Sequence, residues 1–123
     1  MTIEIHVATG LDKGKIFKIS EYRKVSVGRS ESCFFSFPKD KKTSRIHCLV
    51  EIVPPCNCFV ADLQSANGTF LGRAREAKPV SFIKIGSAHL QNGDYLRIGD
   101  TTLIFRWHED NSTLFCSVCN KSL

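Results

Sequence analysis

The sequence predicts an all-β protein, built as an antiparallel β-sandwich of two sheets and about eleven strands. Apolar and polar residues alternate over short stretches, as at Ile3, Ile5 and Val7, and a period of two is typical of strands with one buried face. Gly, Asn and Pro residues separate these stretches at regular intervals, which favours a sandwich. No stretch keeps a helical period for the roughly ten residues that a helix requires.

Six strands are expected in the first half of the chain, separated by turn residues: 3–7, 16–19, 25–28, 33–37, 46–52 and 59–63. The third stops at Gly28, the fourth at Pro38, and the fifth is closed by Pro54 and Pro55, because neither residue type favours the interior of a strand. Cys33 and Cys48 lie in apolar stretches and are expected to be buried as small hydrophobic residues.

Five more strands are expected in the second half: 69–71, 80–85, 87–90, 95–98 and 103–107. Asn-Gly pairs precede the first and the fourth of these, and such pairs are frequent in tight turns. The stretches 80–85 and 87–90 are close enough to form one hairpin. In the last strand Leu103, Phe105 and Trp107 share one face, which should point into the core.

Length and composition limit the function classes. At 123 residues the chain is long enough for one domain with its own core and too short for two ordinary ones. Its apolar stretches are too short to cross a membrane, and its start lacks the features of a signal peptide. A cytoplasmic location without membrane contact is therefore expected. The net charge of +5 favours anionic partners, but no nucleic-acid-binding motif is present.

Four loop motifs occur in a fixed order. They are Val27-Gly28-Arg29-Ser30, Thr43-Ser44-Arg45-Ile46-His47, the stretch 62–70 around Asn67-Gly68-Thr69, and the stretch 90–99 with Asn92-Gly93-Asp94 and Ile98-Gly99. Together they resemble the forkhead-associated (FHA) family, whose members bind phosphothreonine. The resemblance covers about residues 3 to 107 and implies an FHA domain over 1–108, with a tail at 109–123.

The resemblance implies a phosphopeptide site on loops. Arg29 matches the phosphate-contacting arginine, and a guanidinium suits a phosphate better than an ammonium does. Ser44 matches the serine that donates to the phosphate. Asn67 matches the residue that hydrogen-bonds the peptide backbone, although Asn-Gly is also a common turn pair. Further expected binding residues are Arg45, Ser30 and Thr43.

Other matching positions are expected to support the site. Gly28, His47, Gly68 and Thr69 are assigned structural roles, with His47 bracing the loops. The sequence departs from the family at Ala66, where a hydroxyl residue is frequent. A missing hydroxyl would cost about 1 kcal/mol of binding if that bond is normally made.

An enzyme is the second class considered. Ser44, His47 and Asp62 include the residue types of a nucleophilic triad. However, Ser44 is not part of a nucleophile elbow. Ser44 and His47 would also point to opposite faces of an extended segment. The domain itself is therefore expected not to be an enzyme.

A structural zinc site is the third possibility. Cys116 and Cys119 form a C-x-x-C, and Cys56 and Cys58 form a C-x-C. Cys116 and Cys119 could begin a zinc ribbon completed elsewhere, could close a four-cysteine site with Cys56 and Cys58, or could be ordinary thiols. No cofactor is required by the expected function.

A larger protein is expected, because a recognition domain followed by half of a zinc knuckle resembles one part of an assembly. The family implies a signalling adaptor, joined to a kinase or another effector domain. The expected partner is a phosphothreonine-containing protein, such as a Ser/Thr kinase or its substrate.

Overall fold

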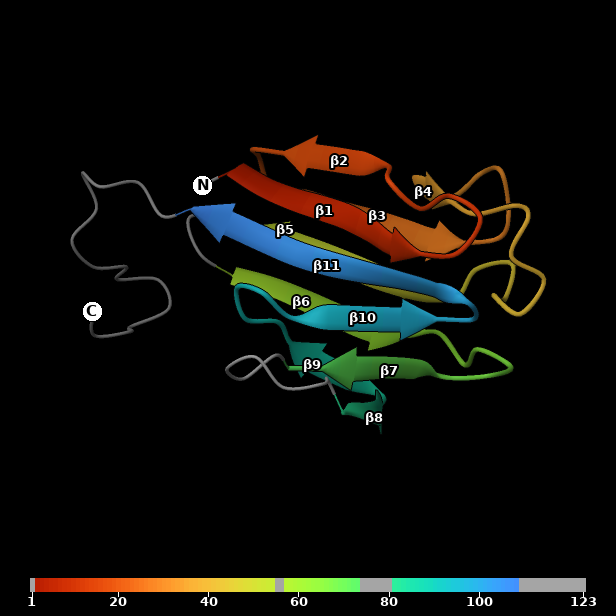
Figure 1. The fold of residues 1–123 in the computed structure, drawn as a ribbon. Helices are drawn as coiled ribbons and strands as arrows, with labels where there is room; N and C mark the ends of the chain where they lie inside the picture. Colours follow the sequence, from red (N-terminus) through yellow and green to blue (C-terminus); the bar gives the residue numbers. More distant parts are fainter. Residues whose placement is uncertain (1, 55–56, 74–80, 109–123) are drawn as a thin grey trace.

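The computed structural model describes residues 2–54, 57–73 and 81–108, which form two sheets of six and five strands. Figure 1 shows the sheets as two layers. The six-stranded sheet contains, in spatial order, β2 (Ile16–Ile19), β1 (Thr2–Thr9), β11 (Thr101–His108), β10 (Tyr95–Ile98), β7 (Thr69–Gly72) and β8 (Phe82–Ile85). The five-stranded sheet contains β4 (Phe35–Ser36), β3 (Arg23–Gly28), β5 (Cys48–Val53), β6 (Asn57–Asp62) and β9 (Ser87–His89). The expected all-β sandwich is confirmed.

The strand connections differ from expectation at two points. The stretches 80–85 and 87–90 do not form a hairpin: β8 pairs with β7 in one sheet, whereas β9 pairs with β6 in the other. The chain changes sheets at Gly86, so the hairpin prediction was wrong. In addition, β3 and β4 pair in parallel in an otherwise antiparallel fold. No described segment forms a helix that could cross a membrane.

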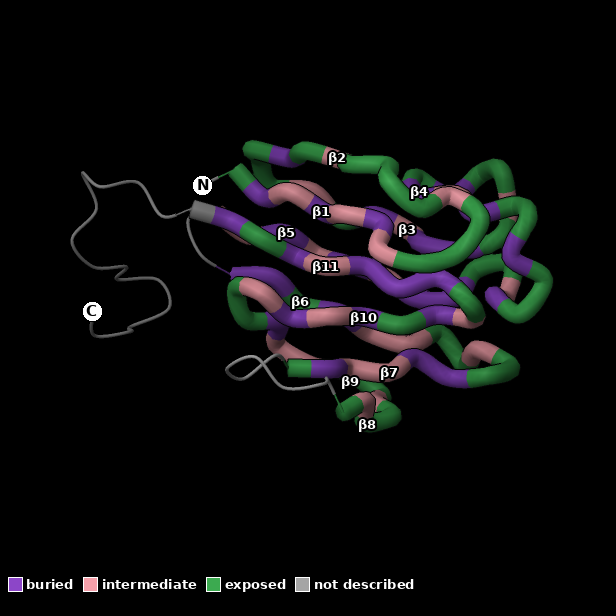
Figure 2. Tube along the Cα trace, in the orientation of Figure 1, coloured by how far each residue is buried: buried purple, intermediate pink, exposed green. Residues whose placement is uncertain are grey.

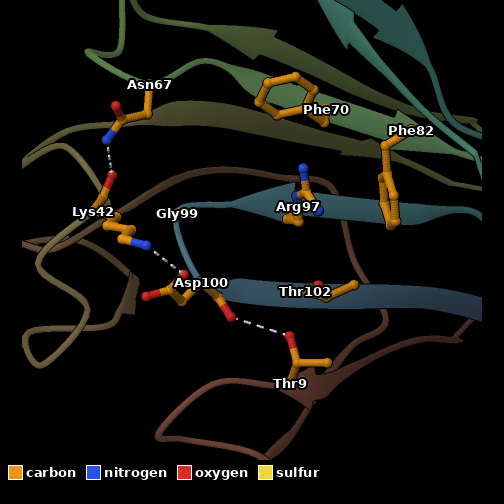
Figure 3. Close-up of a pocket in the computed structure, with 9 residues that line it drawn as sticks. All are labelled: Thr9, Lys42, Asn67, Phe70, Phe82, Arg97, Gly99, Asp100 and Thr102. Atoms are coloured by element: carbon orange, nitrogen blue, oxygen red, sulfur yellow. Dashed lines mark hydrogen bonds and ion pairs between the residues drawn. The ribbon is translucent and has the colours of Figure 1, made fainter.

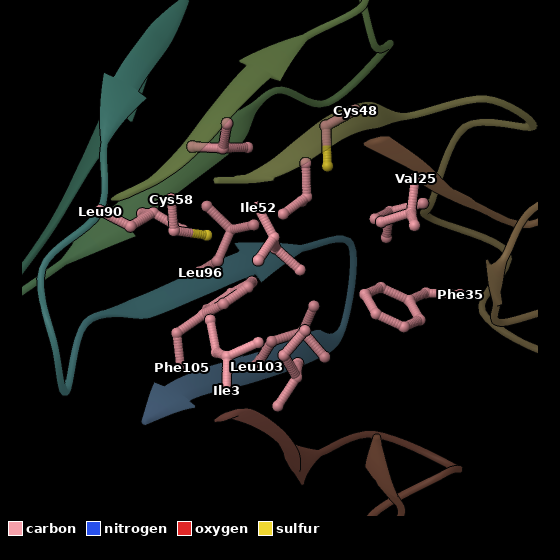
Figure 4. Close-up of a cluster of buried hydrophobic side chains, with 14 of the residues drawn as sticks. Ile3, Val25, Phe35, Cys48, Ile52, Cys58, Leu90, Leu96, Leu103 and Phe105 are labelled. Atoms are coloured by element: carbon pink, nitrogen blue, oxygen red, sulfur yellow. The ribbon is translucent and has the colours of Figure 1, made fainter. Parts of the chain in front are cut away.

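The core lies between the two sheets and consists of the apolar residues that alternate along each strand (Figures 2 and 4). The largest fully buried side chains include Phe35, Phe37 and Phe105. Cys33 and Cys48 are buried as expected, and Cys58 is buried with them. Each fully buried aliphatic or aromatic side chain contributes about 1.5–3 kcal/mol to folding. This core holds the strand ends rigidly in place.

The connections from which a site can be built lie at one end of the sandwich, on the right in Figure 1. They are the segment between β3 and β5, the loop between β6 and β7, and the turn between β10 and β11. Because the chain runs back and forth through the sandwich, alternate connections come to the same end. Three of the four sequence motifs are thereby brought together at that end, and the fourth reaches it through Ile98 and Gly99.

Candidate functional site

A close contact between two loops forms the base of the site. The backbone N–H groups of Arg29 and Ser30 donate to the carbonyls of Ser44 and Arg45, at 2.9 and 3.0 Å. Gly28 precedes them, and a Cβ atom at this position would lie 2.3 Å from the carbonyl oxygen of Arg45. Only glycine therefore permits this approach of the two backbones. The first motif therefore needs its glycine for packing.

Arg29 is exposed at the rim of these loops, but its side chain is held at one point. Its Nε–H donates to the carbonyl of Thr43 at 3.1 Å. Among the described residues, the two terminal amino groups of the guanidinium have no hydrogen-bond or ion-pair partner. A guanidinium fixed through Nε and free at both ends is oriented for a bidentate contact with an anion.

His47 connects two of the loops from below. Its side chain is fully buried, its Nδ1 accepts from the backbone N–H of Ser44 at 3.0 Å, and its Nε2 lies 2.8 Å from the carbonyl oxygen of Gly68. Since Nδ1 accepts a hydrogen bond, Nε2 is the nitrogen that donates to the carbonyl of Gly68. The ring therefore ties Ser44 to the loop that contains Gly68.

Ser44 keeps its hydroxyl proton available. Its Oγ accepts from the backbone N–H of Ala66 at 2.9 Å, which ties the second motif to the third. Both ring nitrogens of His47 are occupied by other groups, so no nucleophile–base pair exists between Ser44 and His47. Ser44 is therefore placed to donate a hydrogen bond and is not activated for attack.

Asn67 is exposed beside Ser44 in the loop between β6 and β7. Its Nδ2 donates to the carbonyl of Lys42 at 2.8 Å (Figure 3), which leaves its Oδ1 free among the described residues. The Asn-Gly pair does not form a hairpin turn, because β6 and β7 lie in different sheets. Gly68 has a φ of 91°, whereas Asn67 does not have a positive φ.

Asp62 fixes the loop that carries Asn67. Its carboxylate accepts from the backbone N–H of Ser65 at 3.2 Å, from the hydroxyl of Ser65, and from the hydroxyl of Thr69 at 2.7 Å. Burial by itself would raise the pKa of Asp62, but the hydrogen bonds from Ser65 and Thr69 outweigh it and leave the pKa below its ordinary value. The hydroxyl of Thr69 thus helps to hold this loop.

Asp40 fixes the segment between β4 and β5 against the turn between β10 and β11. Its carboxylate accepts from the backbone N–H groups of Lys42 and Asp100, at 3.1 and 2.9 Å, and from the hydroxyl of Thr101 at 2.6 Å. Burial opposes ionisation, but these bonds hold the pKa of Asp40 below its ordinary value. The same turn between β10 and β11 contains Gly99, which has a φ of 56°. A Cβ atom there would lie 2.5 Å from the hydroxyl oxygen of Thr43, so this position also requires glycine.

The predicted binding residues do not all face solvent. Thr43 is a correction: its side chain is buried and its hydroxyl donates to the carbonyl of Ile98 at 3.3 Å, so it supports the site and cannot contact a peptide directly. The hydroxyl of Ser30 lies 2.8 Å from that of Ser32, within its own turn. Arg45 is exposed next to Ser44, as expected.

Sequence reasoning missed the supporting carboxylates. Asp62 and Ser65 are three residues apart in a loop, and an Asp that accepts from a following backbone N–H is a common turn arrangement that could have revealed it. Asp40 gave no comparable local signal, because two of its partners, Asp100 and Thr101, lie about sixty residues away.

The cysteine hypothesis is only partly covered by the structure. Cys56, Cys116 and Cys119 lie outside the described residues. Cys58 lies in the core, where burial raises its pKa to about 12. Within the described ranges, no group of three potential ligands is close enough to hold a metal ion.

Comparisons with known proteins agree on one family. The FHA domain model matches residues 25–99, more than half of the chain. One similar solved structure comes from a structural and functional analysis of phosphothreonine-dependent FHA domain interactions; it is 24% identical, with 89% of this chain and 100% of that chain covered and a TM-score of 0.71. The FHA domain of the CT664 protein from Chlamydia trachomatis is 19% identical, with 88% and 99% covered and a TM-score of 0.73.

A third structure, the MEK1 FHA domain in complex with a phosphothreonine peptide of HOP1, is 20% identical, with 87% and 97% covered and a TM-score of 0.63. A comparison with curated protein sequences gives no match. The sandwich and its loop site define a non-catalytic recognition module. More specifically, the chain belongs to the FHA family.

Proposed function

We propose that this domain binds protein segments that contain phosphothreonine, through Arg29, Ser44 and Asn67. A phosphorylated threonine carries nearly two negative charges and three strong acceptor oxygens at neutral pH. The loops offer a cation at Arg29 and a free hydroxyl proton at Ser44, both held by hydrogen bonds before any ligand arrives. Groups that are fixed beforehand lose little entropy on binding.

The orientation of Arg29 is the observation that most supports this proposal. Its Nε bond to Thr43 fixes the guanidinium and leaves both terminal amino groups without a partner among the described residues, and a phosphate can accept from both at once. Asn67 would then hold the peptide backbone, because its Oδ1 can accept from a peptide N–H while its Nδ2 stays bonded to Lys42.

Titration of matched phosphothreonine and unphosphorylated peptides tests the proposal. A phosphothreonine peptide library should select sequences that bind the domain, and their unphosphorylated forms should not bind. Arg29→Ala should weaken binding by about 2–4 kcal/mol, since charge-assisted bonds to phosphate are strong, and Arg29→Lys should restore only part of it.

Arg23→Ala is the matched control. Arg23 lies at the opposite end of β3 and pairs with Glu21 at 2.6 Å, so its replacement should leave peptide binding unchanged. Equal binding of phosphorylated and unphosphorylated peptides would overturn the proposal.

At the level of the cell, we propose that the domain is a signalling adaptor within a larger cytoplasmic protein that also has an effector domain, such as a kinase. The family membership supports a recognition role, and the net charge of +5 supports an anionic partner. Capture of partners from a lysate before and after phosphatase treatment tests this. Capture that persists after dephosphorylation would contradict it.

A further inference from the structure

A groove continues from the peptide-binding loops onto the outer face of the six-stranded sheet (Figure 3). We call it the Arg97 groove. Its walls include Lys42, Asn67, Phe70, Phe82, Arg97 and Asp100. Two of these residues, Lys42 and Asn67, also belong to the loops described above, where they are hydrogen-bonded to each other. The groove and the phosphate-binding loops are therefore adjacent.

The strand register sets the residues of the groove side by side. Arg97 in β10 is the partner of Phe70 in β7 and of Thr102 in β11, and Phe70 is in turn the partner of Lys84 in β8. Directly paired residues project from the same face of a sheet. A row of side chains from four strands therefore crosses this face, with Arg97 near its centre.

Two aromatic rings hold the Arg97 side chain. Its guanidinium carbon lies 5.2 Å from the centre of the Phe70 ring and 4.9 Å from that of Phe82, and Figure 3 shows Arg97 next to both rings. Gly72, the strand partner of Phe82, has no side chain on this face, which leaves room for the Phe82 ring to lean toward Arg97. The rings hold the exposed guanidinium in place by cation–π contact.

The charge of Arg97 is not neutralised within the described part of the chain. No carboxylate there forms an ion pair with Arg97, and no hydrogen bond is made by its guanidinium. The one carboxylate in the groove, that of Asp100, already lies 3.5 Å from the ammonium of Lys42. Lys84 adds a further cation, its side chain lying over Gly68 at the groove's edge. The groove is thus a positively charged surface with apolar walls.

We propose that the Arg97 groove binds an acidic residue of the same phosphopeptide, so that Arg97 is a determinant of sequence specificity. This inference rests on the proposed function. An extended peptide that passes Asn67 reaches the groove within a few residues, since each residue spans about 3.3 Å. The guanidinium makes no hydrogen bond or ion pair within the described residues, so its N–H groups remain free for a carboxylate.

Peptides with a central phosphothreonine in an alanine–serine background test the inference. Each peptide contains one glutamate, and the position of this glutamate on either side of the phosphothreonine changes from one peptide to the next. Every peptide has a counterpart in which glutamine replaces the glutamate. We expect one position, or two adjacent ones, at which glutamate binds the wild-type domain roughly three- to tenfold more tightly than glutamine. In Arg97→Gln this preference should disappear, and in Arg97→Lys part of it should remain. Higher salt should reduce it.

Arg23→Gln is the control, because Arg23 also contacts a ring, that of Phe34 at 4.9 Å, but belongs to the five-stranded sheet and does not line the groove. It should keep the glutamate preference, and thermal melts should show that both variants fold. If Arg97→Gln keeps the full preference for glutamate, or if no position prefers glutamate, the inference is wrong. The proposed function remains intact as long as peptide binding still depends on phosphate and on Arg29. Loss of phosphate dependence in the wild type would instead refute the proposed function.

Discussion

The backbone N–H of Ser44 donates to the Nδ1 atom of His47 at 3.0 Å, so the residue expected to meet the phosphate is positioned by a ring that lies in the core. Through its other nitrogen the same ring holds the carbonyl of Gly68, next to Asn67. One buried side chain thus sets the spacing between two binding loops. Loops held in this way can be exposed and still be rigid.

Replacing His47 should therefore affect both stability and binding. His47→Ala leaves the N–H of Ser44 and the carbonyl of Gly68 without their partner and opens a cavity, at a cost of about 2–4 kcal/mol in the free energy of unfolding. Urea unfolding measures this loss. Peptide affinity, measured where the variant is still folded, should also fall, and unchanged affinity would show that the loops do not depend on the ring.

Gly28 should tolerate no side chain. In Gly28→Ala the new methyl group would lie 2.3 Å from the Arg45 carbonyl, so the two loops must move apart and Arg29 must move with them. We expect tenfold or weaker phosphopeptide binding, on the order of 1.4 kcal/mol or more. Gly86→Ala is the control, because nothing lies within 4 Å of the added carbon. Equal affinities of the two variants would contradict this explanation of Gly28.

Ala66 offers a gain of function. Its backbone N–H already bonds the hydroxyl of Ser44, so a hydroxyl on its side chain would lie at the edge of the expected phosphate site. Ala66→Thr should tighten phosphopeptide binding by about 1 kcal/mol. Calorimetric titration measures the change. The unphosphorylated peptide should gain nothing, and a gain there would show that the new hydroxyl does not act on the phosphate.

Asp62 should make the stability of the domain dependent on acid pH. Its pKa is lowered in the folded state, because the hydrogen bonds from Ser65 and Thr69 outweigh the effect of burial. The stabilisation is therefore complete above the unfolded pKa of about 3.9 and is lost as pH falls through the lower folded value. Asp62→Asn should be less stable at neutral pH by about 1–3 kcal/mol. Its free energy of unfolding should also fall less steeply than that of the wild type below about pH 5. Parallel pH profiles would contradict this.

The strands and the motif residues could be predicted from the sequence, because both are encoded in short stretches of the chain. Alternation assigns a strand without any knowledge of its partner, and the ordered motifs containing Arg29, Ser44 and Asn67 identify the family. Sheet membership was not accessible in the same way. The stretches 80–85 and 87–90 have the spacing of a hairpin, and only their pairing with β7 and β6 shows that they lie in different sheets.

The sequence by itself determined that this is an all-β FHA domain and which loops carry the motifs of the family. Only the tertiary structure decided how the residues of these motifs are arranged. It turned Thr43 inward, joined His47 to two loops, and placed Arg97 between two rings from neighbouring strands. The physical reason is that strand patterns and turns depend on residues close together in the chain. The support of Ser44 by Ala66, and of Asp100 by Asp40, depends instead on hydrogen bonds between distant segments, which form only when the core brings the strand ends together.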